Sequence, residues 1–465
     1  MLELLWHLSF DVSESQFYLR KSSHRSIPQM RNQRESSFLL LMSHILLLPF
    51  GTSGSVFPFI WLGRKLLERG HRVSIIASQL YKHSAEQAGL DFFPPDTDVL
   101  PLMLADADLW RHGTCKKIAF TYAGQATAHC VSAIERVILE TGKPDLILAP
   151  MISFGARIAR EKHGIPLITV HLYPAVMMSA DDAPLVFPAI RLLRLLPLAL
   201  RKFILSLPSP YDRYALPSII KSCDDHGVKP PRRLWKQWHH SPDGVLALFP
   251  NWFSAVKKDQ PPNTFQWDFP LEDLAQQRTI DPELERFLAA GEKPILFTAG
   301  TGQFHAAEFF EIAASVVSRL GCRAVFLTVK KDQLPPNLPD SIFATPYAPF
   351  SVILPLSALM VHHGGIGTLS QCLAAGIPQL VVFMSLDQPD NAARLERLGV
   401  GSSISRNDLT EKRLFPLVKR CLEDQSMKTN ATTHAKRMKQ RPSVAGMLAW
   451  IEKSIHSGRS KQDKN

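Results

Sequence analysis

The chain lacks the features that mark exported, membrane-spanning and zinc-finger proteins. Its six cysteines are scattered, with no Cys-x-x-Cys pair and no histidine at the spacing of a zinc finger. No apolar run reaches the roughly 18 residues that cross a bilayer, and the first residues lack the basic segment of a signal peptide. We therefore expect free thiols, no metal site and a cytoplasmic location.

The remaining composition is that of an ordinary globular protein. The 465 residues are 45% hydrophobic and 20% charged, which suits two domains and excludes collagen, coiled coil and wholesale disorder. The net charge of +11 is concentrated in two basic stretches, 191–240 and 427–465. This local excess argues against nucleic-acid binding and favours contact with an anionic surface; solvated helix faces are the alternative.

The chain becomes regular only from Met42 onward. Residues 1–41 are rich in Ser, Arg and Gln and show little periodicity. We interpret them as a disordered leader, or as the product of a start codon placed too far upstream.

The first regular part alternates apolar runs with amphipathic segments. The expected elements are strands over 45–49 and 73–77 around a turn at 51–55 and a helix over 58–69, and strands over 145–149 and 167–170 around a helix over 156–163. Two strands joined by a helix form a βαβ unit. The pattern therefore predicts a parallel sheet whose ligand crevice lies at the carboxyl ends of the strands.

The same alternation returns after an interruption. Prolines multiply between 176 and 245, a strand is expected at 245–249, and 256–282 has the composition of a linker. Further strands are expected at 295–298, 324–328, 342–344, 359–361 and 379–383, with a helix at 308–319.

These elements predict an α/β protein with two Rossmann-like parallel-sheet domains that face each other across a cleft. The first domain is expected over 42–255 and the second over 283–440. Residues 441–465 are expected to form a C-terminal helix and a basic tail.

The most informative segment is His363-Gly364-Gly365-Ile366-Gly367-Thr368, between a predicted strand and a helix of small residues. It brings an imidazole, a hydroxyl group and several peptides without Cβ atoms to a helix N-terminus. Free N–H groups and the helix dipole attract a phosphate there. We predict that this segment binds a phosphorylated ligand; a hydrogen-bonded turn histidine is the alternative for His363 taken alone.

Two other pairs of residues stand at the ends of predicted strands in the same half. They are Gly300-Thr301 and Asp387-Gln388. Because the carboxyl ends of parallel strands meet at one edge of the sheet, both pairs can converge on the ligand of His363. Asp387 and Gln388 suit a pair of vicinal hydroxyl groups, while an N-cap for a helix beginning near Asn391 is the alternative.

The glycine-rich turn Gly51-x-x-Gly54 of the first half is a weaker signal. It lacks the full dinucleotide motif, and no acidic residue stands near Ala77 and Ser78 to hold a ribose. A nicotinamide cofactor is therefore not expected, and we interpret the turn as part of an acceptor pocket.

Several segments together resemble family 1 nucleotide-sugar glycosyltransferases. Residues 361–401 are similar to the donor-binding signature of that family, and 44–78 are similar to the amino-terminal domain shared with lipid and sterol glycosyltransferases. Residues 237–253 and 347–349 are most similar to bacterial rhamnolipid-type rhamnosyltransferases. The resemblance extends over about residues 42–440.

This resemblance implies a GT-B fold and a specific reaction. The reaction is inverting transfer of a hexose or deoxyhexose from a UDP- or dTDP-sugar, without a metal or another cofactor. The implied acceptor is a hydroxyl group of a hydrophobic molecule such as a lipid, a sterol or a secondary metabolite.

The resemblance also implies the donor-binding residues. His363, Gly364, Gly365, Gly367 and Thr368 are expected to hold the diphosphate, with Gly300-Thr301 closing over it. Tyr347 is expected to stack on the nucleobase, the peptide of Ala348 to read the base edge, and Asp387-Gln388 to hold sugar hydroxyl groups. A half-buried surface aromatic is the alternative for Tyr347.

One position departs from the family pattern. Relatives carry an Asp, the usual candidate base, where this chain has Ser55. Serine cannot accept a proton at neutral pH without a partner. His305 and His171 follow predicted strand ends and are the other candidates for the base, with a non-catalytic histidine as the alternative for each.

Two other functions stay open on this evidence. Ser55 favours a weakly active or inactive nucleotide-sugar binding protein. An epimerase or hydrolase of the same fold would need carboxylates around the sugar, and no paired acidic motif lies near His363.

Leucines alternate with arginines over 191–207, although Pro197 interrupts the pattern. The pattern predicts an interfacial helix in peripheral contact with the inner face of the membrane. A helix packed on its own domain is the alternative.

Overall fold

The computed structural model describes residues 42–110, 113–185, 193, 195–272, 280–302 and 306–462. The expected leader 1–41 and the candidate base His305 lie outside these residues. Both sheets described below belong to one compact unit that begins at Met42.

Seven parallel strands form the first sheet, in the order β3-β2-β1-β4-β5-β6-β7. Their bounds are β1 (His44–Leu47), β2 (Arg72–Ile76), β3 (Asp91–Phe93), β4 (Leu146–Ala149), β5 (Leu167–His171), β6 (Val245–Ala247) and β7 (Thr264–Gln266). The strand order reverses between β1 and β4. The loops that follow these two strands therefore open on the crevice where α/β sheets bind their ligands.

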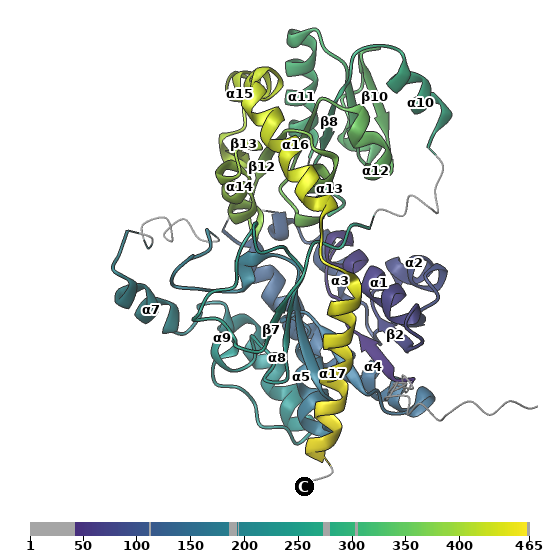
Figure 1. Ribbon diagram of the computed structural model, residues 1–465, viewed down its shortest axis with the longest axis vertical. Coiled ribbons are helices and arrows are strands. Elements are labelled where there is room, and N and C mark those ends of the chain that lie inside the picture. Colours follow the sequence, from purple (N-terminus) through teal and green to yellow (C-terminus); the bar gives the residue numbers. More distant parts are fainter. Residues whose placement is uncertain are drawn as a thin grey trace, which may run out of the picture. The chain divides into compact units, whose positions relative to one another are not determined.

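The helices associated with this sheet are mostly crossover connections (Figure 1). Their bounds are α1 (Ser53–Leu67), α2 (Lys82–Gln87), α3 (Val99–Ala105), α4 (Cys115–Thr141), α5 (Phe154–His163), α7 (Leu198–Ser206), α8 (Asp212–Asp225), α9 (Leu234–Gln237) and α17 (Val444–Gln462).

Six parallel strands form the second sheet, in the order β10-β9-β8-β11-β12-β13. Their bounds are β8 (Ile295–Thr298), β9 (Ala324–Leu327), β10 (Ile342–Thr345), β11 (Leu359–His362), β12 (Gln379–Phe383) and β13 (Gly401–Ser405). The helices are α10 (Pro282–Ala289), α11 (Ala307–Leu320), α12 (Phe350–Ile353), α13 (Ile366–Ala375), α14 (Gln388–Arg397), α15 (Glu411–Glu423) and α16 (Gln425–Lys439). Here the order reverses between β8 and β11, whose ends carry Gly300 and His363.

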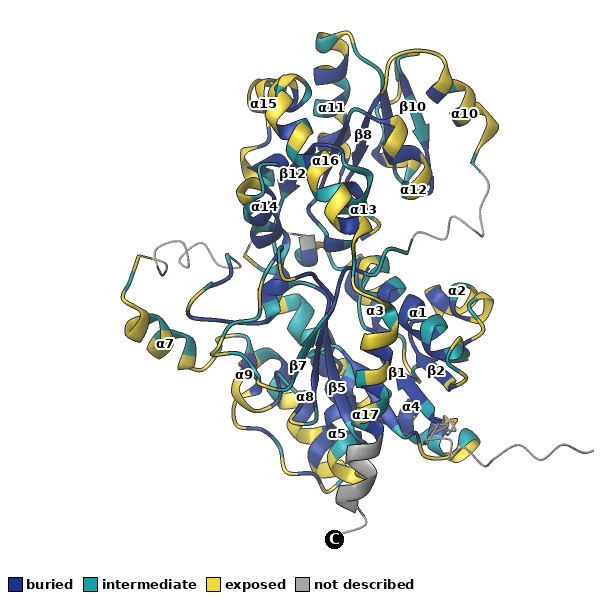
Figure 2. Ribbon diagram, in the orientation of Figure 1, coloured by how far each residue is buried: buried dark blue, intermediate teal, exposed yellow. Residues whose placement is uncertain are grey.

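The strands are buried because helices cover both faces of each sheet, which explains their nearly continuous apolar sequences. Ile45, Leu46 and Leu47 of β1 are fully buried, as are Leu359, Met360 and Val361 of β11. Figure 2 shows the strands of both sheets mainly in the colour of buried residues. The prediction of two parallel-sheet α/β domains is confirmed.

The first helix differs from its expected bounds. It begins at Ser53 rather than at residue 58, so Gly54 and Ser55 lie in its first turn and not in a loop. Pro58 lies inside the helix, in its second turn, where it cannot donate a hydrogen bond to the carbonyl of Gly54. This shift places Ser55 at a helix N-terminus.

The border between the domains also differs from the expectation. The expected linker 256–282 contains β7, which pairs with β6 in the first sheet. The C-terminal helix α17 packs on the same domain, since the ring of Trp450 stacks on Phe265 at 5.3 Å and Arg69 binds Glu452 at 3.0 Å (Figure 1). The first domain is therefore built from two separate stretches of the chain.

The cysteines and the helices were the subject of two expectations from composition. All six cysteines are unpaired thiols, as expected. None of the helices within the described ranges is long and apolar enough to span a bilayer.

Candidate functional site

One cavity of about 460 Å³ brings most of the candidate residues together. It opens at the carboxyl ends of strands from both sheets. The candidates that line it are Ser55, His171, Gly300, Thr301, Tyr347, Ala348, His363, Gly365, Gly367, Thr368, Asp387 and Gln388. Gly364 lies directly behind this wall, against Val381.

Two helix N-termini meet at this cavity. Helix α13 begins after Gly365 and helix α1 begins after Thr52, and no side chain caps either end. A Cβ atom built on Gly367 would lie only 3.8 Å from the Cα atom of Gly54, so the two ends lie in van der Waals reach. Uncapped N–H groups and the positive ends of two helix dipoles make this place suitable for an anion.

The imidazole of His363 is held between two glycines. A Cβ atom at Gly300 would lie 2.5 Å from Cε1 of this ring, and one at Gly365 would also overlap it. Burial lowers the pKa of His363 to about 4, so the ring is neutral at pH 7. Its Nδ1 atom has no hydrogen-bond partner among the described residues. A neutral imidazole at the cavity wall can donate one hydrogen bond and accept another.

Asp387 stands at the N-cap position of α14, but its side chain does not cap the helix. Its carboxylate instead accepts a hydrogen bond from Asn391 Nδ2 at 2.7 Å. Burial raises the pKa of Asp387 to about 6. Leu386, just before it, has a φ of 60°, a left-handed conformation that is unusual for a side chain of this size. The loop before α14 therefore has a strained backbone at Leu386, and Asp387, the next residue, forms part of the cavity wall.

Gln388 has a defined orientation. Its Oε1 atom accepts hydrogen bonds from the backbone N–H groups of Met384 and Ser385, at 2.8 and 3.3 Å. Because the oxygen is occupied, the amide NH₂ is the part of this side chain that is left to donate. A donor beside the acceptor Asp387 suits a pair of hydroxyl groups.

Tyr347 and Ala348 occupy the loop after β10. The side chain of Tyr347 is half-buried and lines the cavity, and the buried Ala348 lines it as well. Thr345 Oγ1 donates to the carbonyl of Tyr347 at 3.1 Å, which fixes the turn. An aromatic face at the cavity wall suits a nucleobase.

The candidate bases differ in their surroundings. Ser55 lines the cavity from the first turn of α1. His171 is 2% exposed, and its Nε2 atom lies 3.0 Å from His240 Nδ1. Burial and the neighbouring His239 keep the pKa of His171 well below its usual value. His171 is therefore tied into a buried group of histidines rather than free at the surface of the cavity.

Residues that the sequence did not single out complete the first-domain wall. The wall is mostly apolar and includes Phe57, Met103, Leu104, Phe120 and Trp235. Lys116 lies among them, and burial lowers its pKa to about 8. Glu272 reaches the cavity from the segment after β7 and binds Arg64 of α1. Their positions depend on which loops the fold brings together, so no local sequence pattern marks them.

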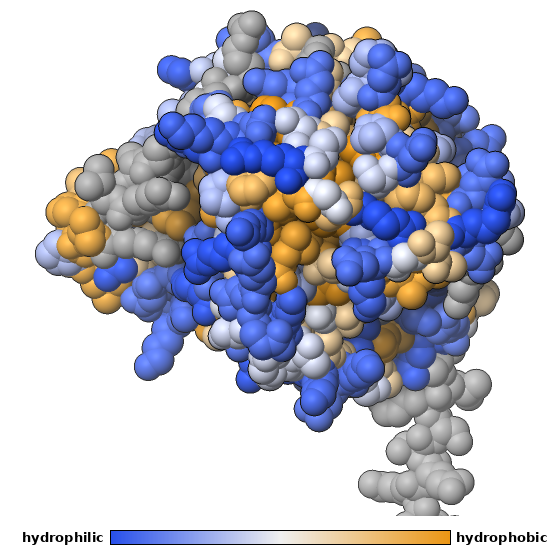
Figure 3. Space-filling model, turned by 90° about the horizontal axis from the view of Figure 1, so that it is seen from above, coloured by the Kyte–Doolittle hydropathy of each residue, from blue (hydrophilic) through white to orange (hydrophobic). Residues whose placement is uncertain are grey.

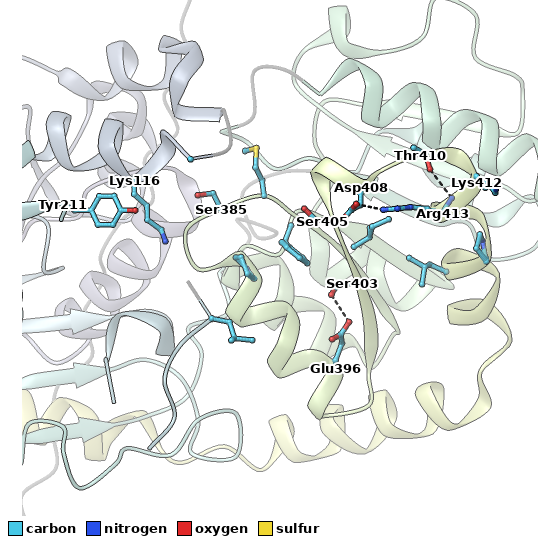
Figure 4. Close-up of a pocket in the computed structure, with 18 residues that line it drawn as sticks. Lys116, Tyr211, Ser385, Glu396, Ser403, Ser405, Asp408, Thr410, Lys412 and Arg413 are labelled. Atoms are coloured by element: carbon cyan, nitrogen blue, oxygen red, sulfur yellow. Dashed lines mark hydrogen bonds and ion pairs between the residues drawn. The ribbon is translucent and has the colours of Figure 1, made fainter. Parts of the chain in front are cut away.

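A second cavity of about 1040 Å³ shares Lys116 and Tyr211 with the first. Figure 4 shows these two residues on one side and Asp408, Thr410 and Arg413 on the other. Asp408 pairs with Arg413, and Ser403 donates to Glu396 at 2.8 Å. These polar groups bind one another, so we do not interpret this cavity as a second binding site. Because it shares Lys116 and Tyr211 with the first cavity, we interpret it as an outer extension of that cavity.

Two family models match the chain in the order of its domains. The glycosyltransferase family 28 N-terminal domain matches residues 45–179. The C-terminal domain of erythromycin biosynthesis protein CIII-like matches residues 314–452.

Similar proteins are themselves named glycosyltransferases. O-mycaminosyltylonolide 6-deoxyallosyltransferase of Streptomyces fradiae is 29% identical over 77% of this chain and 84% of its own length. A sterol 3-beta-glucosyltransferase of Arabidopsis thaliana is 25% identical over 89% of this chain and 66% of its own length. The crystal structure of glycosyltransferase VinC in complex with dTDP has a TM-score of 0.61, at 20% identity over 89% of this chain and 100% of that one.

The fold and the cavity define a sugar transferase of two Rossmann-like domains. The chain belongs to the family 1 glycosyltransferases with the GT-B fold, and it is an enzyme of sugar transfer.

Proposed function

We propose that the enzyme moves a hexose or deoxyhexose from a UDP- or dTDP-sugar to a hydroxyl group of a hydrophobic acceptor, with inversion at the anomeric carbon. The observation that carries this proposal is the meeting of two uncapped helix N-termini beside His363 and an apolar wall. The helix ends suit the diphosphate, and the apolar wall suits the acceptor.

The diphosphate is assigned to the N-terminus of α13. Its first N–H groups, the hydroxyl group of Thr368 and the imidazole of His363 line the same part of the cavity. Gly300 and Gly365 carry no Cβ atoms that would collide with the imidazole ring of His363. The ring can therefore lie at the cavity wall, where a ligand oxygen can approach it closely. The dTDP bound to VinC, a protein of the same fold, supports a nucleoside diphosphate as the ligand.

In the proposed reaction the acceptor oxygen forms a bond to the anomeric carbon while the carbon–oxygen bond to the diphosphate breaks. The electron pair of that bond leaves with the diphosphate, and attack from the opposite face inverts the configuration. Negative charge grows on the departing diphosphate, where donors already in place stabilise it. In this proposal, these hydrogen-bond donors stabilise the negative charge of the diphosphate without a metal ion.

The acceptor proton must leave during the same reaction. Serine is not a base at neutral pH, so we propose that the proton passes from the acceptor oxygen to solvent water beside Ser55. Its hydroxyl group stands in the first turn of α1, where the positive end of the helix dipole stabilises a developing oxyanion. We place the acceptor oxygen next to Ser55, between α1 and the sugar.

The acceptor is proposed to be a ring system of low polarity. Phe57, Phe120 and Trp235 provide aromatic surface around the space in front of Ser55. One similar protein acts on O-mycaminosyltylonolide and another on a sterol, as their names state. Both types of molecule present a hydroxyl group on an apolar body.

The test is a matrix of donors and acceptors followed by mass spectrometry. UDP-glucose and dTDP-rhamnose would each be incubated with a macrolide aglycone, a sterol and a membrane lipid extract. We expect a product with one added sugar, and an inverted anomeric configuration by proton NMR. Saturable binding of nucleotide sugars without any glycosylated product would contradict the proposal, and retained configuration would contradict the inverting mechanism.

We further propose that α7 touches an anionic lipid surface. None of its residues is buried. Leu200 and Phe203 are 42% and 60% exposed beside the cationic Arg201 and Lys202, and Leu207, directly after the helix, is 50% exposed. Figure 3 shows apolar surface at the edge of the molecule where α7 projects. Pro197 precedes the helix as its N-cap and does not interrupt it. Apolar side chains next to basic ones are typical of interfacial helices.

This contact can be tested by co-sedimentation with vesicles. We expect binding to vesicles that contain phosphatidylglycerol and weaker binding to neutral ones, and we expect Phe203→Glu to abolish it. Leu139→Glu is the matched control, because Leu139 is an equally apolar side chain, 86% exposed on α4. Equal sedimentation of the wild type and the Phe203→Glu variant would overturn the contact.

A further inference from the structure

Three histidines from two distant parts of the chain converge beside the cleft. His171 ends β5, while His239 and His240 follow α9. One ring nitrogen from each of the three lies within 4.8 Å of the other two. Among the described residues this is the only group of three or more potential metal ligands of the His, Cys, Asp and Glu types.

The tautomer of His239 is fixed by its surroundings. Its Nε2 atom contacts the carbonyl oxygen of Val176, which can only accept a hydrogen bond, so Nε2 carries the proton. The Nδ1 atom is then a bare lone pair, and it is buried without any partner among the described residues. A buried acceptor left without a donor or cation costs free energy. Metal-binding histidines commonly donate their second nitrogen to a backbone carbonyl in this way.

His171 and His240 already have the spacing of two ligands on one ion. His171 Nε2 lies 3.0 Å from His240 Nδ1. Two nitrogens bound to a tetrahedral zinc ion at roughly 2.0–2.1 Å lie about 3.3 Å apart. A shift of a few tenths of an ångström therefore converts this contact into a pair of ligands.

The protonation state of the three imidazole rings is also the one that metal binding requires. Burial lowers the pKa of His239 to about 4, and the pKa values of His171 and His240 are lower than usual for the same reason. All three imidazoles are therefore neutral at pH 7, which is the form that binds a metal.

The backbone around the group is held in place. Ser241 N donates to Thr169 Oγ1 of β5 at 2.8 Å, and Arg157 binds the carbonyls of Gln237 and His240, each at 3.4 Å. The ring of Trp235 lies 4.4 Å from that of His239. A rigid scaffold of this kind keeps ligands at fixed positions.

We propose that His171, His239 and His240 bind a divalent cation of the zinc class, which ties the segment after α9 to the end of β5. Three imidazoles leave a fourth position of the tetrahedron for water. The site is separate from the diphosphate-binding end of α13 and does not depend on the proposed donor or acceptor. It differs from the expectation of no metal site, because the proposed ligands come from segments whose proximity only the fold creates.

The test measures the metal directly on the full-length protein, purified without a polyhistidine tag or chelators. We expect about one zinc per chain by elemental mass spectrometry. After removal of the metal, Co²⁺ alone should give the visible absorption of a tetrahedral site, saturating at one equivalent. Zn²⁺ should also raise the melting temperature of the stripped protein, because it binds only the folded state.

The variants His171→Gln, His239→Gln and His240→Gln should each weaken Co²⁺ binding by about 100-fold or more. His83→Gln is the matched control, since His83 is exposed on α2, and it should bind Co²⁺ as the wild type does. Wild-type protein that binds no Co²⁺ saturably would overturn the proposal even if the variants fail to fold. Unchanged Co²⁺ affinity in the three folded variants would overturn it as well.

Discussion

The imidazole of His363 fills the space that a side chain at Gly300 would occupy. A Cβ atom at Gly300 would lie 2.5 Å from Cε1 of the ring, and Gly300 has a φ of +87°. Two separate loops, those after β8 and β11, thus fit together only because one of them carries no side chain. The imidazole of His363 and the glycine therefore act as one structural unit.

Gly300→Ala should therefore reduce kcat/KM by about 100-fold, because displacement of a catalytic group by about 1 Å has effects of this size. The positive φ adds backbone strain to the displacement. Steady-state kinetics with varied donor will measure the loss. Gly446→Ala is the control, since Gly446 is exposed on α17 and nothing lies within 4 Å of a Cβ atom there, and an equal loss in both variants would argue against the fit of ring and glycine.

His363→Ala should lower kcat by about 10²–10³-fold, as expected for the loss of one donor to a developing negative charge. The equilibrium affinity for the nucleotide should change less, because the charge grows mainly in the transition state. Kinetics together with calorimetric titration of dTDP and UDP separate the two effects. His83→Ala, at an exposed position on α2, should leave both unchanged, and a loss confined to nucleotide affinity would show that His363 only binds.

Ser55→Asp should raise kcat/KM by about tenfold or more, since a carboxylate at this position can accept the acceptor proton. The rate should then fall at low pH as the new carboxylate becomes protonated. Ser55→Asn introduces a side chain of similar size that is not a base, and it should bring no gain. If the Asp and Asn variants behave alike, the base lies elsewhere.

Asp387 should make the enzyme less stable as the pH rises. Its pKa is about 6 in the folded protein and 3.8 in its usual state, so the folded state binds more protons between these values. The free energy of unfolding therefore falls from about pH 4 to pH 6 and stays lower above that range. Asp387→Asn should remove this dependence, stabilising the protein at pH 7 by about 1–3 kcal/mol and lowering its activity.

Urea unfolding at pH 4 and pH 7 measures the effect. The gain from Asp387→Asn should be present at pH 7 and nearly absent at pH 4. The amide preserves the hydrogen bond from Asn391 Nδ2, so lost packing does not obscure the result. An equal gain at both pH values would show that the charge of Asp387 is not its cause.

The buried guanidinium of Arg394 should be essential for stability. It binds Asp390 at 2.7 Å and Asp182 at 3.0 Å, and Asp390 also accepts a hydrogen bond from Leu185 N. Arg394→Met removes the cation that faces the buried carboxylate of Asp390 and should cost about 3–5 kcal/mol. Arg397→Met should cost at most about 1 kcal/mol, because Arg397 binds the same Asp182 from a half-exposed position. Similar costs for both variants, measured by urea unfolding, would contradict this assignment.

The sequence predicted the parallel sheets well, and the reason is physical. Strands such as β8 and β12 are buried on both faces, so they appear as apolar runs with turns at their ends. β7 was missed because its three residues are only half-buried. β13 was missed because Gly401, Ser402 and Ser403 interrupt any apolar run. The start of α1 was placed too late, since Gly and Ser there favour a turn when read alone.

The residues of the candidate site also fall into two groups, those that the sequence predicted and those that it did not. The residues around His363 follow strand ends, and parallel strands bring such ends together, so their common cavity could be predicted. Lys116, Trp235 and Glu272 come from connections whose paths no local pattern reveals. His171 and the pair His239-His240 were each visible in the sequence, but 69 residues separate His171 from His240, and only the fold brings them into contact.

Helix α17 gives the molecule an unusual constraint for protein engineering. Since it returns to the first sheet after the second domain is complete, the second domain is an insertion between two pieces of the first domain. Chimaeras that join an N-terminal half to a foreign C-terminal half would deprive Phe265 of Trp450 and Arg69 of Glu452. An exchange of donor specificity should therefore replace an internal cassette, from about residue 280 to about residue 440, and leave both ends of the chain in place.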